Sequence, residues 1–310
     1  MDIQLVIRKY ALQNAVQFEG KATVGSVLGK VMAENPELRP KAKEVTVLAK
    51  TVVDDINKMS PEDQRKALES ESPELLVKES RVREMGLPDL KNVQGEVRMR
   101  MAPNPSGPLH IGHSRMGILN DEYVKRYGGI CYDRFEDTDP ARVDPDGYRT
   151  IPEDFAWLGV RIDKTVIQSD RFEIYYDIAK KLLEMGKAYV CTCKPDDWRE
   201  LKNRKLPCPH REQPLSEQMV RWNRMFDGSY KPEEASVMVK TDLEHPNPAI
   251  RDFVGLRIDD TPHPRTGKKY RVYPLMNLAV AVDDHLFDLT HVLRGKDHLN
   301  NTYRQMYVYD

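Results

Sequence analysis

The sequence lacks a long hydrophobic run. No stretch of about 18 consecutive apolar residues occurs, which is the length that a membrane-spanning helix requires. The first residues, Met1-Asp2-Ile3-Gln4, lack the basic and then apolar pattern of a secretory signal. The sequence therefore predicts a soluble protein of the cytoplasm with no membrane partner.

The chain also lacks an excess of charge of either sign. Lysine and arginine number 48 against 49 aspartates and glutamates, so the net charge is −1. A chain without an overall basic field is a poor binder of nucleic acid in general, and any RNA contact must be local. The 310 residues, 40% of them hydrophobic, are enough for two or three domains.

Cysteine is scarce, with four residues in the chain, and a cytoplasmic location argues against disulfides. Cys191 and Cys193, followed by Cys208 and His210, offer three thiolates and one imidazole, a donor set that suits a closed tetrahedral zinc site. Common zinc knuckles space their ligands by two residues rather than one, so two unrelated pairs in turns remain the alternative. Cys131 stands apart and fits a buried strand.

The N-terminal region is helical in pattern. Apolar residues recur at helical spacing through residues 1–70, as in amphipathic helices. Pro36, Pro40 and Pro61 interrupt that pattern and divide it into several helices. The charged, turn-prone segment 71–95 is interpreted as a linker to the next domain.

Residues 98–113 carry the most informative pattern. A strand ending at Met101 leads into a Pro- and Gly-rich turn, and apolar residues then recur at helical spacing. His110 and His113 fall on one face of the first helical turn, where free N–H groups and the helix dipole favour a phosphate. Gly112 leaves room for a flat base beside the backbone. An ordinary capped helix is the alternative reading.

A second strand, at residues 128–135, follows this helix and completes a predicted βαβ unit. Glu136, Asp137 and Asp139 come directly after the strand, in a loop at the carboxyl edge of the sheet, where ligands bind in such folds. A solvated acidic turn is the alternative. Helices are predicted near 148–158 and 175–185, and a strand at 189–193.

The polar segment 191–269 looks like an insertion, with strands expected at 237–240 and 250–254. Residues 273–285 and 289–298 are expected to be strand-like runs that return to the first sheet, and residues 300–309 a helix. Five basic residues of the insertion are either local RNA-phosphate contacts or solvated charges of a surface helix: Arg199, Lys202, Arg204, Lys205 and Arg211.

The run Pro-x-Pro-x-Gly-x-Leu-His-Ile-Gly-His within residues 103–113 resembles the "HIGH" element of class I aminoacyl-tRNA synthetases. Residues 135–140, 282–285 and 292–298 resemble glutamyl-tRNA synthetases of the archaeal/eukaryotic type, and the N-terminal helical region resembles the extra domain of archaeal members. The resemblance implies an α/β fold. Its Rossmann-type nucleotide-binding domain comes in two halves, 96–190 and 270–310, around an inserted acceptor-binding domain at 191–269.

The resemblance also implies roles for individual residues. His110 and His113 are catalytic, stabilising the ATP phosphates, and Arg100 and Glu136 bind a carboxylate and the α-ammonium of the amino acid. Arg294 selects glutamate over glutamine, because an arginine left unpaired in a dry pocket is costly. Met276 stands where bacterial relatives place a tyrosine, so Tyr273 is the substitute contact. The ATP-binding set is Pro103, Asn104, Gly107, His110, Gly112 and His113.

The implied reaction joins L-glutamate to the 3′ end of tRNA(Glu), with ATP, Mg²⁺ and a structural Zn²⁺ as cofactors. Whether tRNA(Gln) is also charged stays open, and the N-terminal domain is a candidate contact for other translation factors. No Lys-Met-Ser-Lys-Ser-like loop follows His298, so the chain is expected to be the N-terminal part of a longer protein. The alternatives are a glutaminyl-tRNA synthetase, a short paralogue that glutamylates a modified tRNA nucleoside, and a non-catalytic tRNA-binding fragment.

Overall fold

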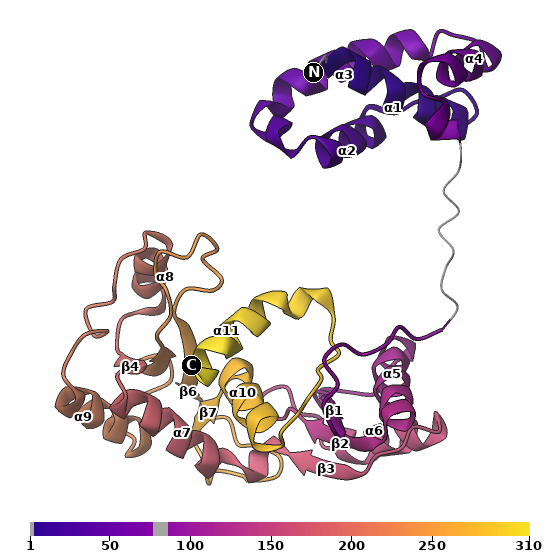
Figure 1. Ribbon diagram of the computed structural model, residues 1–310. Helices are drawn as coiled ribbons and strands as arrows, with labels where there is room; N and C mark the ends of the chain where they lie inside the picture. The colour runs from indigo at the N-terminus through magenta and orange to yellow at the C-terminus, as the bar shows by residue number, and fades with distance from the viewer. Residues whose placement is uncertain (1–2, 77–85) are drawn as a thin grey trace. The chain divides into compact units, whose positions relative to one another are not determined.

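The computed structural model describes residues 3–76 and 86–310 of the chain. It divides into two compact units, residues 1–88 and 89–310, which are coloured along the chain in Figure 1. Part of the linker expected at 71–95, residues 77–85, lies outside the described residues.

The N-terminal unit is built of helices, as the sequence predicts. These are α1 (Ile3–Gln17), α2 (Val24–Glu34), η1 (Pro36–Lys41), α3 (Ala42–Ile56), α4 (Pro61–Glu71) and η2 (Pro73–Leu76). The prolines set the boundaries: α2 ends before Pro36, and α4 begins at Pro61 because Ser60 caps it by accepting the N–H of Asp63. Fully buried Ile7, Leu12 and other apolar side chains form its core.

The second unit begins with a three-stranded parallel sheet in the order β1-β2-β3. Its elements are β1 (Val97–Met101), α5 (Ile111–Tyr127), β2 (Gly129–Phe135), α6 (Gly147–Trp157) and β3 (Lys164–Ile167). The predicted βαβ unit is thus β1–α5–β2. Gly129 allows the close pairing of β1 and β2, because a Cβ there would lie 1.9 Å from the Val97 carbonyl oxygen.

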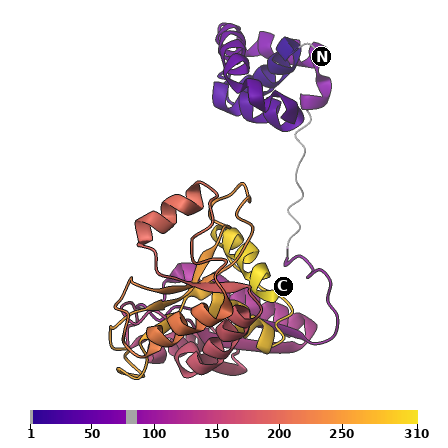
Figure 2. The ribbon, with the colours of Figure 1, turned by 90° about the vertical axis from the view of Figure 1, so that its left-hand side faces the viewer.

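A second sheet is antiparallel, in the order β4-β5-β6-β7. Its strands are β4 (Ala188–Cys191), β5 (Ser236–Val239), β6 (Phe253–Ile258) and β7 (Val272–Pro274), and its neighbouring helices are η3 (Gln168–Asp170), α7 (Phe172–Glu184), α8 (Pro195–Asn203) and α9 (Leu215–Phe226). One apolar core joins α7, α9, this sheet and the helix that follows it. Helix α8 buries none of its residues and projects from the body of the unit in Figure 2. Strands β4 and β5 overlap most of the predicted segments 189–193 and 237–240, whereas β6 shares only Phe253 and Val254 with the predicted 250–254. The boundaries 191–269 remain a prediction.

The prediction of strand-like runs after residue 273 is wrong. The chain instead forms α10 (Met276–Leu286), a loop with η4 (Lys296–His298), and α11 (Leu299–Tyr309), the last as expected. Residues 277–284 are buried on all sides, so their apolar run has no periodicity that separates a helix from a strand. The return to the first sheet is limited to a loop, in which the Thr290 and His291 N–H groups donate to the Arg98 carbonyl at the edge of β1.

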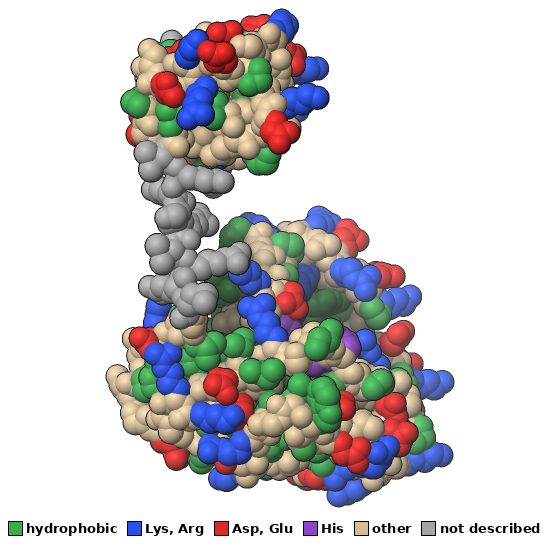
Figure 3. All heavy atoms as spheres, turned by 90° about the vertical axis from the view of Figure 1, so that its right-hand side faces the viewer, with side chains coloured by type: hydrophobic (Ala, Val, Ile, Leu, Met, Phe, Trp, Pro, Cys, Tyr) green, Lys and Arg blue, Asp and Glu red, His purple; other side chains and the backbone are tan. Residues whose placement is uncertain are grey.

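No helix among the described residues is long and apolar enough to cross a membrane. Basic and acidic side chains are interspersed over the face shown in Figure 3, in keeping with the balanced composition.

Candidate functional site

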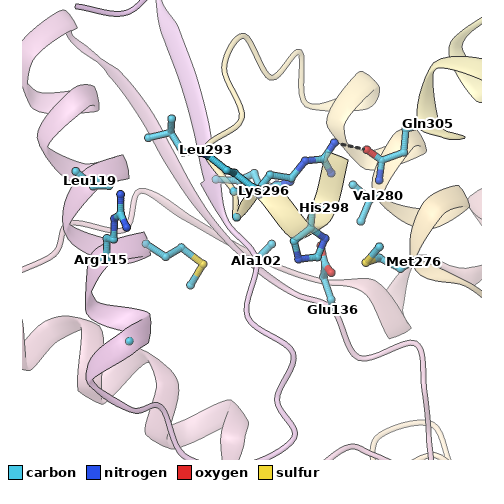
Figure 4. Close-up of a pocket in the computed structure, with 15 residues that line it drawn as sticks. Ala102, Arg115, Leu119, Glu136, Met276, Val280, Leu293, Lys296, His298 and Gln305 are labelled. Atoms are coloured by element: carbon cyan, nitrogen blue, oxygen red, sulfur yellow. Dashed lines mark hydrogen bonds between the residues drawn. The ribbon is translucent and has the colours of Figure 1, made fainter. Parts of the chain in front are cut away.

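A cavity of about 640 Å³ opens at the carboxyl ends of β1 and β2, in the second unit. Figure 4 shows side chains from α5, from the loop after β2, from α10 and from the 293–298 segment gathered around it. Its lining includes the predicted Arg100, Gly112, Glu136 and Arg294, together with Met276. Five segments far apart in the sequence therefore meet at the crevice where parallel α/β sheets bind ligands.

A network of buried charges lies at the inner end of this cavity. Arg134 is fully buried and donates to Glu136 Oε1 at 2.9 Å and to Asp284 Oδ1 at 2.5 Å. The Arg100 Nε lies 3.5 Å from the same Asp284 oxygen. Burial lowers the pKa of Arg100, and the positive charge of the nearby Arg134 lowers it further. We call these four residues and Arg294 the inner charge cluster.

Arg294 approaches the cavity without a carboxylate partner among the described residues. Its Nη2 donates to Thr302 Oγ1 at 2.5 Å and to Gln305 Oε1 at 3.0 Å, both on α11. The inner charge cluster thus holds three guanidinium groups and two carboxylates, a net charge of +1, before any ligand is bound.

The two predicted catalytic histidines cap α5. The Gly112 N–H donates to His110 Nδ1 and the His110 N–H donates to His113 Nδ1, each at 3.1 Å. Because both Nδ1 atoms accept, the neutral imidazoles carry their proton on Nε2, which remains a donor. Burial, and then His110, lower the pKa of His113 and favour this neutral form.

The histidines themselves do not line the cavity, whereas Gly112 on the same turn does. A Cβ at Gly112 would lie 2.7 Å from His110 Cε1, so glycine is required there for the His110 ring to lie across the helix start. Two exposed basic residues, Arg115 and Lys296, line the same cavity and have no carboxylate partner among the described residues.

A second cavity, of about 490 Å³, shares Glu136 and Met276 with the first. Two buried amide oxygens of its lining, Gln168 Oε1 and Asn277 Oδ1, have no hydrogen-bond partner in the part of the chain that the structure describes. Asn104 also lines this second cavity. Pro103 and Gly107, which are near Asn104 in the sequence, line neither the first cavity nor the second.

Tyr273 is not at the site. Its side chain is fully buried in the core beneath the second sheet, and its hydroxyl lies within hydrogen-bond distance of the Thr261 and Tyr270 carbonyl oxygens. It lines neither cavity, so the structure does not support the predicted contact with the amino acid. Strand β7 turns this residue inward, and Met276, at the start of α10, faces the cavities in its place.

The predicted metal ligands come together. Donor atoms of Cys191, Cys193, Cys208 and His210 all lie within 4.8 Å of one another. Cys208 Sγ is 3.3 Å from Cys191 Sγ, 3.5 Å from Cys193 Sγ and 3.3 Å from His210 Nδ1. A tetrahedral site with Zn–S bonds of about 2.3 Å has edges of about 3.8 Å, so the four atoms fit one small cation.

The electrostatics of this cluster already favour one thiolate. Hydrogen bonds, foremost from the Cys191 thiol and also from the His210 N–H, hold the pKa of Cys208 at about 5, although burial opposes the shift. Burial raises the pKa of Cys193 to about 11. His210 Nε2 lies 3.0 Å from Thr192 Oγ1, which leaves Nδ1 facing the sulfur atoms.

Four of the five basic residues expected to contact RNA are paired with carboxylates: Arg199 with Asp196, Arg204 with Glu200, Lys205 with Glu244, and Arg211 with Asp252 and Glu212. Lys202 differs from them. It lines the second cavity, its Nζ lies 4.9 Å from the Trp198 ring centre, and no carboxylate pairs with it in the described part of the chain. Burial, and then Arg304, lower its pKa to about 8.

Three important residues carried no predicted role: Arg134, Asp284 and Gln305. A signal existed for the first two, because each is a charge inside a segment that is otherwise buried. Gln305 is the one buried residue of a helix whose other residues are exposed or partly exposed, and no sequence pattern distinguishes it.

Comparisons with known proteins agree on the family. Residues 96–310 match the family model described as tRNA synthetases class I (E and Q), catalytic domain. The chain is 53% identical over 304 residues to the glutamate–tRNA ligase of Thermoplasma volcanium, covering 98% of this chain and 56% of that protein. It is 52% identical over 310 residues to the glutamate–tRNA ligase of Methanothermobacter marburgensis, covering 100% of this chain and 55% of that protein.

A solved glutamate–tRNA ligase from Elizabethkingia meningosepticum, in complex with its amino acid, has the same fold, with a TM-score of 0.51 and 24% identity. The match covers 69% of this chain and 46% of that one. The chain spans about half the length of the curated relatives it matches. The cavity at the carboxyl ends of β1 and β2, the histidine-capped helix and the family match agree, and this chain belongs to the class I tRNA synthetases of the glutamate and glutamine (E and Q) group.

Proposed function

We propose that the chain carries the amino-acid-activating site of a glutamate–tRNA ligase. At this site ATP and L-glutamate form glutamyl-adenylate, and the glutamyl group is then transferred to tRNA(Glu). The observation that carries the proposal is the charge of the inner cluster, three guanidinium groups against two carboxylates. Glutamate has two carboxylates and one ammonium, so its net charge of −1 neutralises the cluster, whereas neutral glutamine does not.

Glu136 is the one acidic residue among those that line the first cavity in the described part of the chain, so it is the acceptor for the α-ammonium. Arg100 and Arg294 are the donors for the carboxylates. Arg134 holds Glu136 from behind and keeps its carboxylate at the cavity wall.

ATP, bound as its Mg²⁺ complex, is proposed to lie along the first turn of α5. The Nε2–H groups of the neutral His110 and His113 offer hydrogen bonds to the phosphates, and the exposed cations of Arg115 and Lys296 offer positive charge. The α-carboxylate of glutamate attacks the α-phosphorus, pyrophosphate leaves, and the donors stabilise the charge that develops on the phosphate oxygens. Gly112 remains our candidate for the contact with adenine.

The tRNA is proposed to present its terminal adenosine to the second cavity. The unpaired oxygens of Gln168 and Asn277 suit ribose hydroxyl or adenine amino donors, and Lys202 suits a phosphate. The shared wall at Glu136 and Met276 then places a ribose hydroxyl next to the adenylate. A ribose oxygen attacks the glutamyl carbonyl carbon, and AMP is released.

The Cys₃His cluster is proposed to hold a structural Zn²⁺, because its four donors match the ligand types and spacing of closed zinc sites. The ion would connect the end of β4 to the segment that follows α8. Helix α8 itself bears Lys202 and borders the second cavity.

The test is ATP-dependent charging, measured on the protein at the full length of its relatives, with radiolabelled glutamate or glutamine and with tRNA(Glu) or tRNA(Gln). We expect glutamate to be attached to tRNA(Glu). Its attachment to tRNA(Gln) as well would add a second partner. Every relative reported above is named a glutamate–tRNA ligase, so glutaminyl activity is not favoured.

Attachment of glutamine would show that the charge argument is wrong. Absence of charging together with absence of ATP binding would replace the proposal by the non-catalytic tRNA-binding alternative.

A further inference from the structure

Gln305 of α11 lies against the first cavity although its side chain is almost wholly buried, with 3% of the residue exposed. Its Oε1 accepts a hydrogen bond from Arg294 Nη2 at 3.0 Å, the dashed line in Figure 4. Its Nε2, turned away from the guanidinium in that view, has no hydrogen-bond partner within the described ranges 3–76 and 86–310.

The orientation of this amide is fixed by its neighbour. A guanidinium has only N–H donors, so the oxygen of the Gln305 amide must face Arg294 and the NH₂ group must face elsewhere. A buried NH₂ group without a partner costs free energy, and a ligand acceptor in the adjoining cavity removes that cost.

We propose that Gln305 is a specificity-determining residue, whose amide N–H and the Arg294 guanidinium together bind the side-chain carboxylate of the amino acid. This inference rests on the proposed function, and it adds a residue and a hydrogen-bond rule to it. Thr302, the other acceptor for Arg294, is also on α11, so this helix holds the guanidinium beside the Gln305 amide.

The pair discriminates by hydrogen-bond polarity as well as by charge. Arg294 and the Gln305 NH₂ both donate, so a ligand group that contacts both must accept from each of them, which a carboxylate does with its two oxygens. The side-chain amide of glutamine brings an NH₂ group of its own, which would meet donors and leave a buried donor unpaired. A hydrogen bond to a charged group corresponds to about 10- to 150-fold in affinity, so Gln305 has a measurable share in the selectivity.

The test uses two stable sulfamate analogues, of glutamyl-adenylate and of glutaminyl-adenylate, which differ in the carboxylate and amide of the side chain. Their dissociation constants are measured by calorimetry on the 310-residue chain and on two variants. Gln305→Glu keeps the shape and turns the donor into an acceptor, and Gln305→Met removes the donor. Met306→Ala changes an exposed neighbour on the same helix and is the control.

We expect Gln305→Met to weaken the glutamyl analogue about tenfold or more and to leave the glutaminyl analogue within about threefold. In Gln305→Glu the new carboxylate pairs with Arg294, so the ratio of the two affinities should move further toward the glutaminyl analogue. ATP affinity and the unfolding midpoint, measured in parallel, should stay near those of the Met306→Ala control, which separates a specificity role from a folding defect.

An unchanged affinity ratio in both Gln305 variants would overturn the inference while leaving the proposed function in place. If the unmodified chain binds the glutaminyl analogue as tightly as the glutamyl analogue, the proposed function itself fails and the role of Gln305 fails with it.

Discussion

Replacing Asp133 by asparagine is expected to remove a marked pH dependence from the stability of the second unit. Asp133 lies on β2, paired in register with Met101 of β1, and none of its side chain is exposed. Neither of its carboxylate oxygens has a hydrogen-bond partner among the described residues. Burial without a partner disfavours the charged form and raises the pKa of Asp133 to about 7.

The magnitude follows from proton linkage. An aspartate in the unfolded chain has a pKa of about 3.9, so folding shifts this group by about 3 pKa units. Each unit corresponds to about 1.4 kcal/mol, which makes the full effect on the order of 4 kcal/mol.

The raised pKa of Asp133 makes the folded state less stable as the pH rises. Below about pH 4 the carboxyl is protonated in both states and contributes no difference. Between about pH 4 and 7 the unfolded chain has lost this proton while the folded chain keeps it, so the free energy of unfolding falls as pH rises. Above about pH 7, the pKa of Asp133 in the folded chain, the free energy of unfolding falls no further on account of this group.

The assay is urea unfolding followed by tryptophan fluorescence at pH 5, 6, 7 and 8. Trp157, Trp198 and Trp222, the three tryptophans of the chain, all lie in the second unit, so the signal reports that unit alone. Asn has no proton to lose, so the difference between Asp133→Asn and the unmodified chain should increase with pH up to about 7. A difference that is constant from pH 5 to 8 would refute the reasoning.

Three further measurements test the site. Arg134→Met removes the partner of two carboxylates and should lower the free energy of unfolding by about 3–5 kcal/mol, whereas Arg149→Met, which breaks an exposed pair, should cost less than about 1 kcal/mol; equal losses would contradict the buried network. Arg294→Leu should weaken the glutamyl-adenylate analogue by about 30-fold or more, and unchanged binding would remove Arg294 from the pocket. The chain purified under reducing conditions should contain one zinc ion by atomic emission, lost in Cys208→Ser; a metal-free chain would defeat the zinc proposal.

Much of the fold follows from local sequence signals. The prolines at positions 36 and 61 bound helices where they were expected to, because proline cannot continue a helix from the preceding turn. The β1–α5–β2 unit follows from a change in periodicity across the turn at residues 106–108. Segment 276–286 could not be assigned, since a helix buried all round and a buried strand give the same apolar run.

Site residues that belong to a sequence motif could be predicted, whereas residues that reach the site only through tertiary packing could not. His110, Gly112 and Glu136 stand in recognisable motifs, and the last two line the cavity. Tyr273 was misplaced because only three residues separate this buried strand position from Met276, which begins the next helix and lines the cavities. No local pattern reveals that Gln305 lies across from Arg294, because that contact exists only once α11 packs on α10.

The proposed selectivity arises from the polar side chains of the cavity wall, most of which are hydrogen-bond donors. Arg100 from β1, Arg294 from the loop before η4 and Gln305 from α11 present N–H groups, and Glu136 is the sole acidic residue among the described residues that line the cavity. A ligand must therefore bring one cationic donor group and acceptors for the remaining wall. Glutamate satisfies that rule at both ends, whereas glutamine satisfies it at one end and leaves donors facing donors at the other.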